Sequence, residues 1–170
     1  MWSPVWIWES EIPYNICDQI IDGSNKIEYE KGLTQSGAPD GRKVNIKFLY
    51  EEFNWINALI CGYGLFANCE NFKYELSKCD IEGVQLSRYT LGQFYNKHVD
   101  FNGNPDTKSH TRKLSMSVQL SDENSYDGGN LIIHYGGEQY IAPKLKGTVI
   151  VFDSRSVSYT HLTLPTNREV

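Results

Sequence analysis

The sequence has few cysteines and does not space them as zinc ligands. Cys17, Cys61, Cys69 and Cys79 form no CxxC pair, and no histidine stands near them at zinc-finger spacing. This argues against a structural zinc site, which needs four close cysteine or histidine ligands. We therefore expect four reduced thiols.

The sequence also lacks long apolar runs and an excess of positive charge. Residues 1–9, MWSPVWIWE, show neither a basic leader nor a membrane-length apolar stretch, so we expect no signal peptide or membrane span and a cytoplasmic protein. Lysine and arginine number 16 against 21 acidic residues, which gives a net charge of −5. With no basic footprint, nucleic acid and anionic membranes are disfavoured as partners.

What is present is the composition of one globular domain. The chain has 170 residues, of which 40% are hydrophobic and 13% aromatic, enough for a sizeable core but not for two ordinary domains. No internal repeat, low-complexity segment or interdomain linker is visible.

The first third of the chain has helical periodicity. The segment Pro13–Asp22 carries apolar residues at helical spacing, with proline suited to the first turn and Gly23 to the end. A second helical stripe is interrupted by two glycines, Gly62 and Gly64. Its apolar positions are Leu49, Phe53, Ile56 and Ile60.

After Asn71 the apolar period changes to two, which predicts strands. The alternating or continuous apolar positions are Phe72, Tyr74 and Leu76; Val84 and Leu86; Leu114, Met116, Val118 and Leu120; Leu131–Ile133; and Thr148–Phe152. Two N-terminal helices followed by many short strands predict a mainly β protein, a β-sandwich or jelly roll braced by helices.

One pair of residues predicts chemistry. His98 and Asp100 stand two apart in an extended segment, so both side chains point to the same face and can hold one metal ion. Such a pair arises by chance in roughly one chain of this size in five, so the neighbouring residues must support the prediction.

Those neighbours resemble a known family. The segment Arg88–Asp100 resembles the Y-x-x-G-x-x-Y-x-x-H-x-D signature of 2-oxoglutarate and Fe(II)-dependent dioxygenases of the prolyl 4-hydroxylase-like superfamily, which includes the PKHD-type hydroxylases. Arg112–Ser121, Tyr126–Leu131 and Gly147–Ser154 look like three later strands of the bacterial and phage hydroxylases in that group, in the same order.

The resemblance implies a fold and a reaction. The fold would be a double-stranded β-helix (jelly roll, cupin-like) with N-terminal helices. The reaction would be hydroxylation of a peptidyl residue such as proline, or of a small molecule, with release of succinate and CO2. Fe(II), 2-oxoglutarate as cosubstrate and ascorbate as reductant would be required. The alternative is a non-catalytic jelly-roll binding module or viral accessory protein, since a jelly roll does not determine function.

The resemblance also assigns residues. His98 and Asp100 would be two ligands of the facial 2-His-1-carboxylate triad, which leaves metal positions open for 2-oxoglutarate and oxygen. Tyr89 is the better candidate to hydrogen-bond 2-oxoglutarate and Tyr95 the second, although both are also ordinary strand aromatics. Arg112 would be a solvated charge.

The end of the chain departs from the family pattern. His161 and Pro165 mimic its H-x-x-x-P, so His161 is the candidate third ligand, but Arg168 comes too early to anchor 2-oxoglutarate and the last strand is missing. Residues 157–166, VSYTHLTLPT, look like a translation of a transposon-end adapter used to prepare sequencing libraries. We therefore expect one domain over 1–156, with helical support over 1–70 and a jelly-roll core over 71–156, and a non-native tail over 157–170.

Two polar segments would select the substrate. Lys31–Arg42 and Phe101–Thr111 are rich in glycine, asparagine, proline and serine, as loops that close over a site often are.

Overall fold

The computed structural model describes residues 2–32, 41–50, 53–76, 83–101, 111–162 and 168–169. Much of the two segments predicted to select the substrate, 33–40 and 102–110, lies outside these ranges. The helices are α1 (Tyr14–Gly23), α2 (Asn54–Ala67), the short 3₁₀ helices η1 (Ser24–Lys26) and η4 (Glu123–Ser125), and the π-helical η3 (Asn68–Phe72). The strands are β1 (Val5–Trp8), β2 (Glu30–Lys31), β3 (Arg42–Lys43), β4 (Asn45–Leu49), β5 (Val84–Tyr89), β6 (Phe94–Val99), β7 (Leu114–Val118), β8 (Gly128–Tyr135), β9 (Glu138–Ile141), β10 (Val149–Asp153), β11 (Val157–Leu162) and β12 (Arg168–Glu169).

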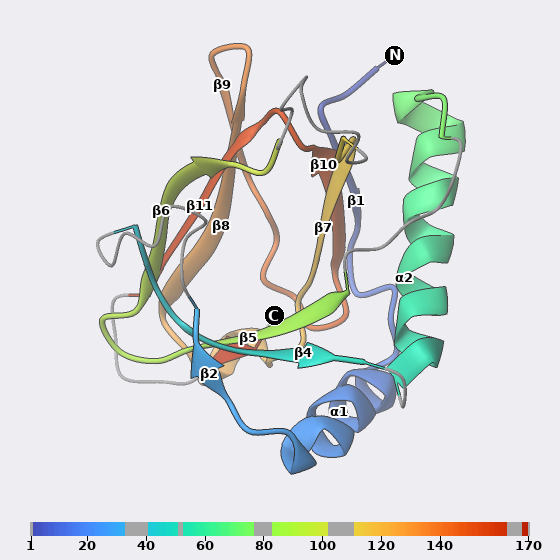
Figure 1. Ribbon diagram of the computed structural model, residues 1–170. Coiled ribbons are helices and arrows are strands. Elements are labelled where there is room, and N and C mark those ends of the chain that lie inside the picture. The colour runs from blue at the N-terminus through green and yellow to red at the C-terminus, as the bar shows by residue number, and fades with distance from the viewer. Residues whose placement is uncertain are drawn as a thin grey trace.

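The strands pair antiparallel in three groups: β1-β10-β7, β3-β6-β11-β8-β9 and β12-β5-β4-β2. Figure 1 shows the β6-β11-β8 group facing the β7-β10-β1 group, with β4 and β5 running across below them. Neighbours within a sheet are distant in sequence, such as β6 with β11 and β1 with β10, as expected for a jelly roll. The predicted fold class is confirmed.

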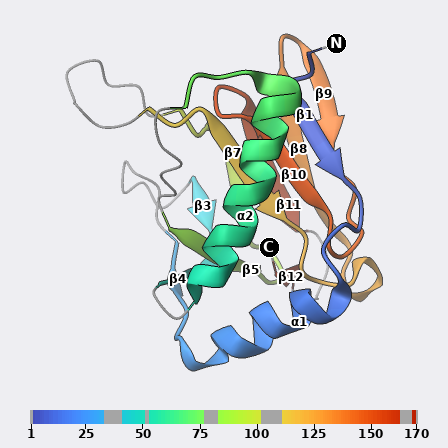
Figure 2. The ribbon, with the colours of Figure 1, turned by 90° about the vertical axis from the view of Figure 1, so that its right-hand side faces the viewer.

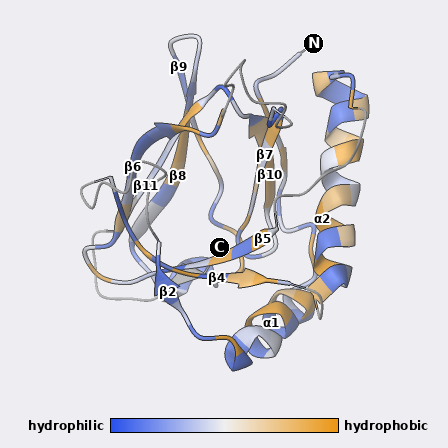
Figure 3. Cartoon of the chain, viewed as in Figure 1, coloured by the Kyte–Doolittle hydropathy of each residue, from blue (hydrophilic) through white to orange (hydrophobic). Residues whose placement is uncertain are grey.

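Strand β10 lies at the centre of the molecule and is buried on both faces. Val149 and Val151 pack into the core shared with the helices, whereas Ile150 and Phe152 point into the space between the sheets. A strand covered on both sides has no polar face, which explains its continuous apolar run. Figure 3 shows the apolar colour along β10 and β8.

The two helices cover the outer face of the β1-β10-β7 sheet and its lower end. Figure 2 shows α2 lying across β7 and β10, with α1 below it. Helix α1 follows Pro13, whose φ of −54° suits a helix start, and it buries Cys17 and Ile20 in the core. The predicted first helix is confirmed to within a residue at each end.

Helix α2 differs from its predicted outline. It begins at Asn54, and Leu49 belongs instead to strand β4. It also continues through Gly62 and Gly64, which the sequence predicted to interrupt it. A Cβ at position 64 would lie 3.2 Å from the sulfur of Met116, so glycine there allows the helix to approach β7 closely.

Two other predictions were wrong. Residues 72–76, predicted as a strand from their alternation, form the end of η3 and an irregular segment. The predicted helical support over 1–70 also contains strands, and β1 and β4 pair with β10 and β5 of the core. Strands this short carry too few residues for periodicity to reveal them.

The cysteines do not all behave as predicted. Cys17 and Cys69 are free thiols, but Cys61 forms a disulfide with a cysteine outside the described ranges. In the described part of the chain, neither α-helix has the length and apolar character needed to cross a membrane.

Candidate metal centre

Strand β6 brings His98 and Asp100 together, as their spacing predicted. His98 is on the strand and Asp100 directly follows it, and His98 Nε2 lies 3.3 Å from Asp100 Oδ1. Both side chains are only about one-fifth exposed, at 21% and 20%. The two side chains therefore form a half-buried polar pair beside β11.

The other imidazole nitrogen of His98 is held by the backbone. Nδ1 lies 2.8 Å from the carbonyl oxygen of Asn96. A carbonyl only accepts hydrogen bonds, so Nδ1 donates to it and Nε2 is the ring nitrogen left to face Asp100. Metal-binding histidines are commonly oriented in this way by a backbone carbonyl.

Asp100 is kept ionised by its neighbours. Burial alone would raise the pKa of Asp100, but contacts with His98 and the Ser115 hydroxyl, together with the positive charge of Arg112, hold it below its usual value. Arg112 Nη1 lies 3.5 Å from Asp100 Oδ1. The sequence predicted a solvated Arg112, and the structure instead places it against the carboxylate.

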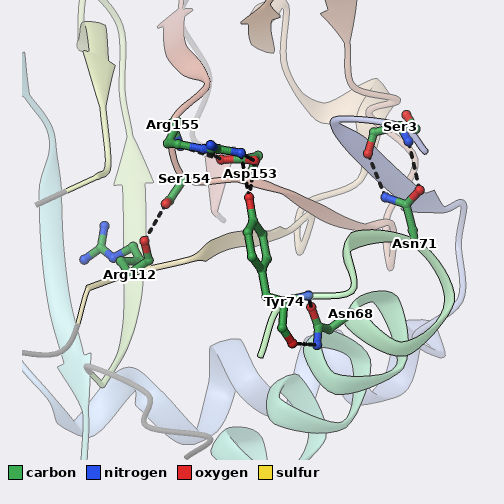
Figure 4. A network of polar contacts seen from close by, with 8 residues as sticks. All are labelled: Ser3, Asn68, Asn71, Tyr74, Arg112, Asp153, Ser154 and Arg155. Atoms are coloured by element: carbon green, nitrogen blue, oxygen red, sulfur yellow. Dashed lines mark hydrogen bonds and ion pairs between the residues drawn. The ribbon is translucent and has the colours of Figure 1, made fainter. Parts of the chain in front are cut away.

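Residue 112 is itself fixed by the end of β10. The Ser154 hydroxyl donates to the carbonyl oxygen of Arg112 at 2.7 Å, and the Ser154 backbone N–H donates to the Lys113 carbonyl at 3.1 Å. Figure 4 shows Ser154 reaching Arg112 from the strand that also carries Asp153. No motif in the sequence signals this support.

Next to Ser154, the Asp153 carboxylate is the centre of a buried polar network (Figure 4). Its side chain is 0% exposed and accepts hydrogen bonds from Tyr74 Oη at 2.5 Å and from Arg155 Nε at 2.9 Å. Burial and the hydrogen bond to Asp153 raise the pKa of Tyr74 to about 12, so its hydroxyl stays protonated. This network joins β10 to the segment after η3 and stabilises the strand end next to the metal centre.

The predicted cosubstrate residues lie on β5 and β6, which follow one another in the chain but belong to different sheets. Tyr89 on β5 is 6% exposed and packs with Val44, Ile46 and Tyr126. Tyr95 stacks on His98, with ring centroids 3.5 Å apart, and the Arg42 guanidinium lies 4.5 Å from the centre of its ring. Burial raises the pKa of Tyr95, so its hydroxyl stays protonated.

A β-bulge explains why Tyr95 and His98 share a face. Between the pairs His98–Ser158 and Tyr95–Thr160, two residues of β6 lie opposite a single residue of β11. The extra residue shifts the alternation by one position, so residues three apart point the same way. Regular alternation along a strand would place Tyr95 and His98 on opposite faces, so the sequence alone does not reveal this stack.

The structure does not place His161 opposite His98. The pairing register puts Ser158 opposite His98 and the backbone of His161 opposite Phe94, four residues along β6. At the usual strand rise, four residues span about 13 Å. The described side chains contain no group of three His, Cys, Asp or Glu able to hold a metal.

A two-residue strand lies near the end of the chain. Arg168 and Glu169 form β12, which pairs with Tyr89 and Arg88 of β5. Strand β12 therefore ends beside the strand that carries Tyr89.

The donor set fits an iron ion in part. Two ligands bound to one ion at about 2.1 Å and a right angle stand about 3.0 Å apart. The 3.3 Å between His98 Nε2 and Asp100 Oδ1 is close to this distance. The third position of a 2-His-1-carboxylate triad is not supplied by any described histidine.

Comparisons with known proteins show what the chain is similar to. The chain is similar to PKHD-type hydroxylases of Synechococcus sp. strain CC9605, at 37% identity over 78 residues, and of Prochlorococcus marinus strain MIT 9312, at 31% over 81 residues. These alignments cover 45% and 48% of this chain, and only 34% of each relative. The chain thus matches about a third of the length of these relatives.

Solved structures share the fold over nearly the whole chain. A prolyl-4-hydroxylase from Pseudomonas putida superposes with a TM-score of 0.74 at 17% identity, covering 98% of this chain and 88% of that one. The viral collagen prolyl hydroxylase of Paramecium bursaria Chlorella virus-1 gives 0.72 at 18%, covering 98% and 92%. A Trichoplax adhaerens prolyl hydroxylase, solved with a hypoxia inducible factor peptide fragment, gives 0.76 at 12%, covering 98% and 80%.

The family model described as the 2OG-Fe(II) oxygenase superfamily matches residues 84–170, which are 87 of the 170 residues and include β5, β6 and the His98–Asp100 pair. The chain belongs to the 2OG-Fe(II) oxygenase superfamily.

Proposed function

We propose that this chain is part of an Fe(II)- and 2-oxoglutarate-dependent dioxygenase that hydroxylates a peptidyl residue, in the manner of prolyl hydroxylases, or a small molecule. Succinate and CO2 would be the co-products and ascorbate the reductant. The observation that carries the proposal is the His98–Asp100 pair, with Nε2 and Oδ1 3.3 Å apart and the imidazole oriented by the Asn96 carbonyl.

The protein residues around the pair have distinct roles in this proposal. His98 and Asp100 would hold the iron, which supplies oxygen activation with 2-oxoglutarate as the source of electrons. Arg112 keeps Asp100 ionised, and Tyr95 fixes the plane of the His98 ring by stacking. Tyr89 would donate a hydrogen bond to a 2-oxoglutarate oxygen, since it is a buried tyrosine in the cluster against which Tyr95 packs.

Two solved structures with the same fold support a peptide substrate. The Trichoplax neighbour is described as a complex with a peptide fragment. The Chlorella virus neighbour is described as a collagen prolyl hydroxylase. Both share the fold of this chain, and they favour a peptide substrate over a small molecule.

A second candidate is a non-catalytic jelly-roll binding module. The observation that favours it is that the described side chains contain no group of three possible metal ligands around His98 and Asp100. The two candidates differ in one property, because only an oxygenase consumes 2-oxoglutarate.

The test is succinate release by the full-length protein in the presence of Fe(II), 2-oxoglutarate and ascorbate, with bound iron measured in the same sample. We expect slow release even without a hydroxylation substrate, and its loss in His98→Ala. Lys97→Ala is the matched control, because Lys97 is an exposed residue of the same strand, and this variant should retain the activity. Protein that holds one equivalent of Fe(II) at His98 and still releases no succinate would contradict the oxygenase and favour the binding module.

A further inference from the structure

Strand β11 supplies the side chains closest to the metal centre from across the sheet. It pairs antiparallel with β6, and its buried polar residues alternate with half-buried ones. Ser158 and Thr160 are 3% and 7% exposed and face inwards, whereas Val157 and Tyr159 are half-buried. Side chains at 158 and 160 are therefore the ones that β11 can direct towards the site.

Of these two positions, 158 is in register with the metal ligands. Ser158 is directly opposite His98, and its Oγ lies 3.3 Å from His98 Nε2. The same nitrogen lies 3.3 Å from Asp100 Oδ1. His98 Nε2 thus has a carboxylate oxygen from its own segment and a hydroxyl from the opposite strand within hydrogen-bonding distance.

Serine is a poor metal ligand. Its hydroxyl is neutral and keeps its proton, whereas first-row metals in such sites take imidazole nitrogen and carboxylate oxygen. In the neutral tautomer of His98 whose Nδ1 donates to the Asn96 carbonyl, Nε2 is an acceptor and the Ser158 hydroxyl donates to it. This hydrogen bond occupies the lone pair that a metal would use.

We propose that position 158 is the third ligand position of the metal centre and that serine leaves this chain with a two-ligand site. The backbone of His161 is opposite Phe94, four residues along β6 from His98. This inference rests on the proposed iron site at His98 and Asp100. It implies that an imidazole at position 158 completes the site, whereas an imidazole elsewhere on β11 does not.

The experiment is a titration with Co(II), followed by equilibrium dialysis and visible absorption, on the chain and its variants. We expect Ser158→His to bind Co(II) at least about tenfold more tightly than the unmodified chain. Thr160→His is the matched control, because Thr160 is a buried inward residue of the same strand, and this variant should bind as the unmodified chain does. His161→Ala should also leave the affinity unchanged.

Three results would overturn the inference. These are no tighter binding by Ser158→His, an equal gain in Thr160→His, and loss of Co(II) binding in His161→Ala. If Ser158→His fails to fold by circular dichroism, Ser158→Gly with added imidazole tests the same position. Added imidazole should tighten Co(II) binding in Ser158→Gly and not in Thr160→Gly, and absence of that difference would also overturn the inference.

The proposed function can fail separately. If Ser158→His binds Co(II) tightly but, loaded with Fe(II), releases no succinate, the ligand position stands and the oxygenase activity does not.

Discussion

The hydroxyl of Ser154 donates a hydrogen bond to the carbonyl oxygen of Arg112 at 2.7 Å, and so ties the end of β10 to the residue whose guanidinium faces Asp100. This contact links the buried polar network around Asp153 to the candidate metal centre. Support from outside the ligands themselves is typical of metal sites, whose ligands must be held in a fixed orientation.

Removing that hydroxyl should cost stability. Ser154→Ala leaves the Arg112 carbonyl without this donor, and we expect a loss of about 1–2 kcal/mol in the free energy of unfolding, measured by urea titration. Ser125→Ala is the control, because its hydroxyl also donates to a backbone carbonyl, that of Asp122, but in an exposed turn. It should change the free energy by less than about 0.5 kcal/mol. Equal losses in the two variants would show that Ser154 has no special role.

The Asp153 carboxylate should make stability depend on pH. Burial raises its pKa, but hydrogen bonds from Arg155 and Tyr74 outweigh this and hold the pKa below the usual aspartate value. The carboxylate therefore stabilises the fold fully above the usual pKa of about 4, and the contribution is lost as the pH falls through the lower folded value.

The variant that tests this is Asp153→Asn. At pH 7 we expect the variant to be less stable by about 2–3 kcal/mol. This is at or below the range of about 3–5 kcal/mol for breaking a fully buried ion pair, because the Arg155 side chain is 52% exposed and water screens its charge. The difference in unfolding free energy between the chain and the variant should shrink as the pH is lowered from 7 to 3. A difference that stays constant over this range would mean that the ionised carboxylate does not provide the stabilisation.

Gly147 should be the least replaceable glycine among those described. Its φ is +82°, and a Cβ there would lie 2.1 Å from the carbonyl oxygen of Ile12, too close for any real contact. Gly147→Ala should therefore cost more than about 3 kcal/mol or prevent folding. Gly136 also has a positive φ, +58°, but open space around it, so Gly136→Ala should cost only about 1 kcal/mol. Similar thermal unfolding temperatures for the two variants would contradict this account.

The sequence predicted the strands that are buried or strongly alternating. Strands β7, β8 and β10 were recognised because their apolar periods reflect burial on one or both faces. Strands β2 and β3 have two residues each and pair only because their neighbours hold them in place. No local pattern in two residues can reveal such a strand.

The candidate site was predictable where it depends on local spacing. His98 and Asp100 follow from strand geometry, and their contact is as expected. The contact of Ser158 with His98 joins residues 60 positions apart in the sequence, and the contact of Ser154 with Arg112 joins residues 42 positions apart. Pairing register over such distances is set by tertiary packing, so these contacts appear only in the folded structure.

Residues 157–170 make a separate prediction about the gene. We propose that they are a non-native tail, as the similarity of VSYTHLTLPT to a sequencing adapter indicates. They can still form β11 because Val157, Tyr159 and Thr160 favour strands and small polar residues fit the inward positions. Sequencing native DNA should give a frame with histidine in place of Ser158, whereas an unchanged frame encoding VSYTHLTLPT would refute the proposal.

The central claim is that His98 and Asp100 hold a metal ion, and Co(II) titration of three variants tests it most directly. His98→Ala and Asp100→Asn should bind Co(II) at least about tenfold more weakly than the intact chain. His134→Ala should bind as the intact chain does, since His134 is on β8 and stacks on Tyr159. Undiminished binding of one equivalent of Co(II) by folded His98→Ala would contradict the claim.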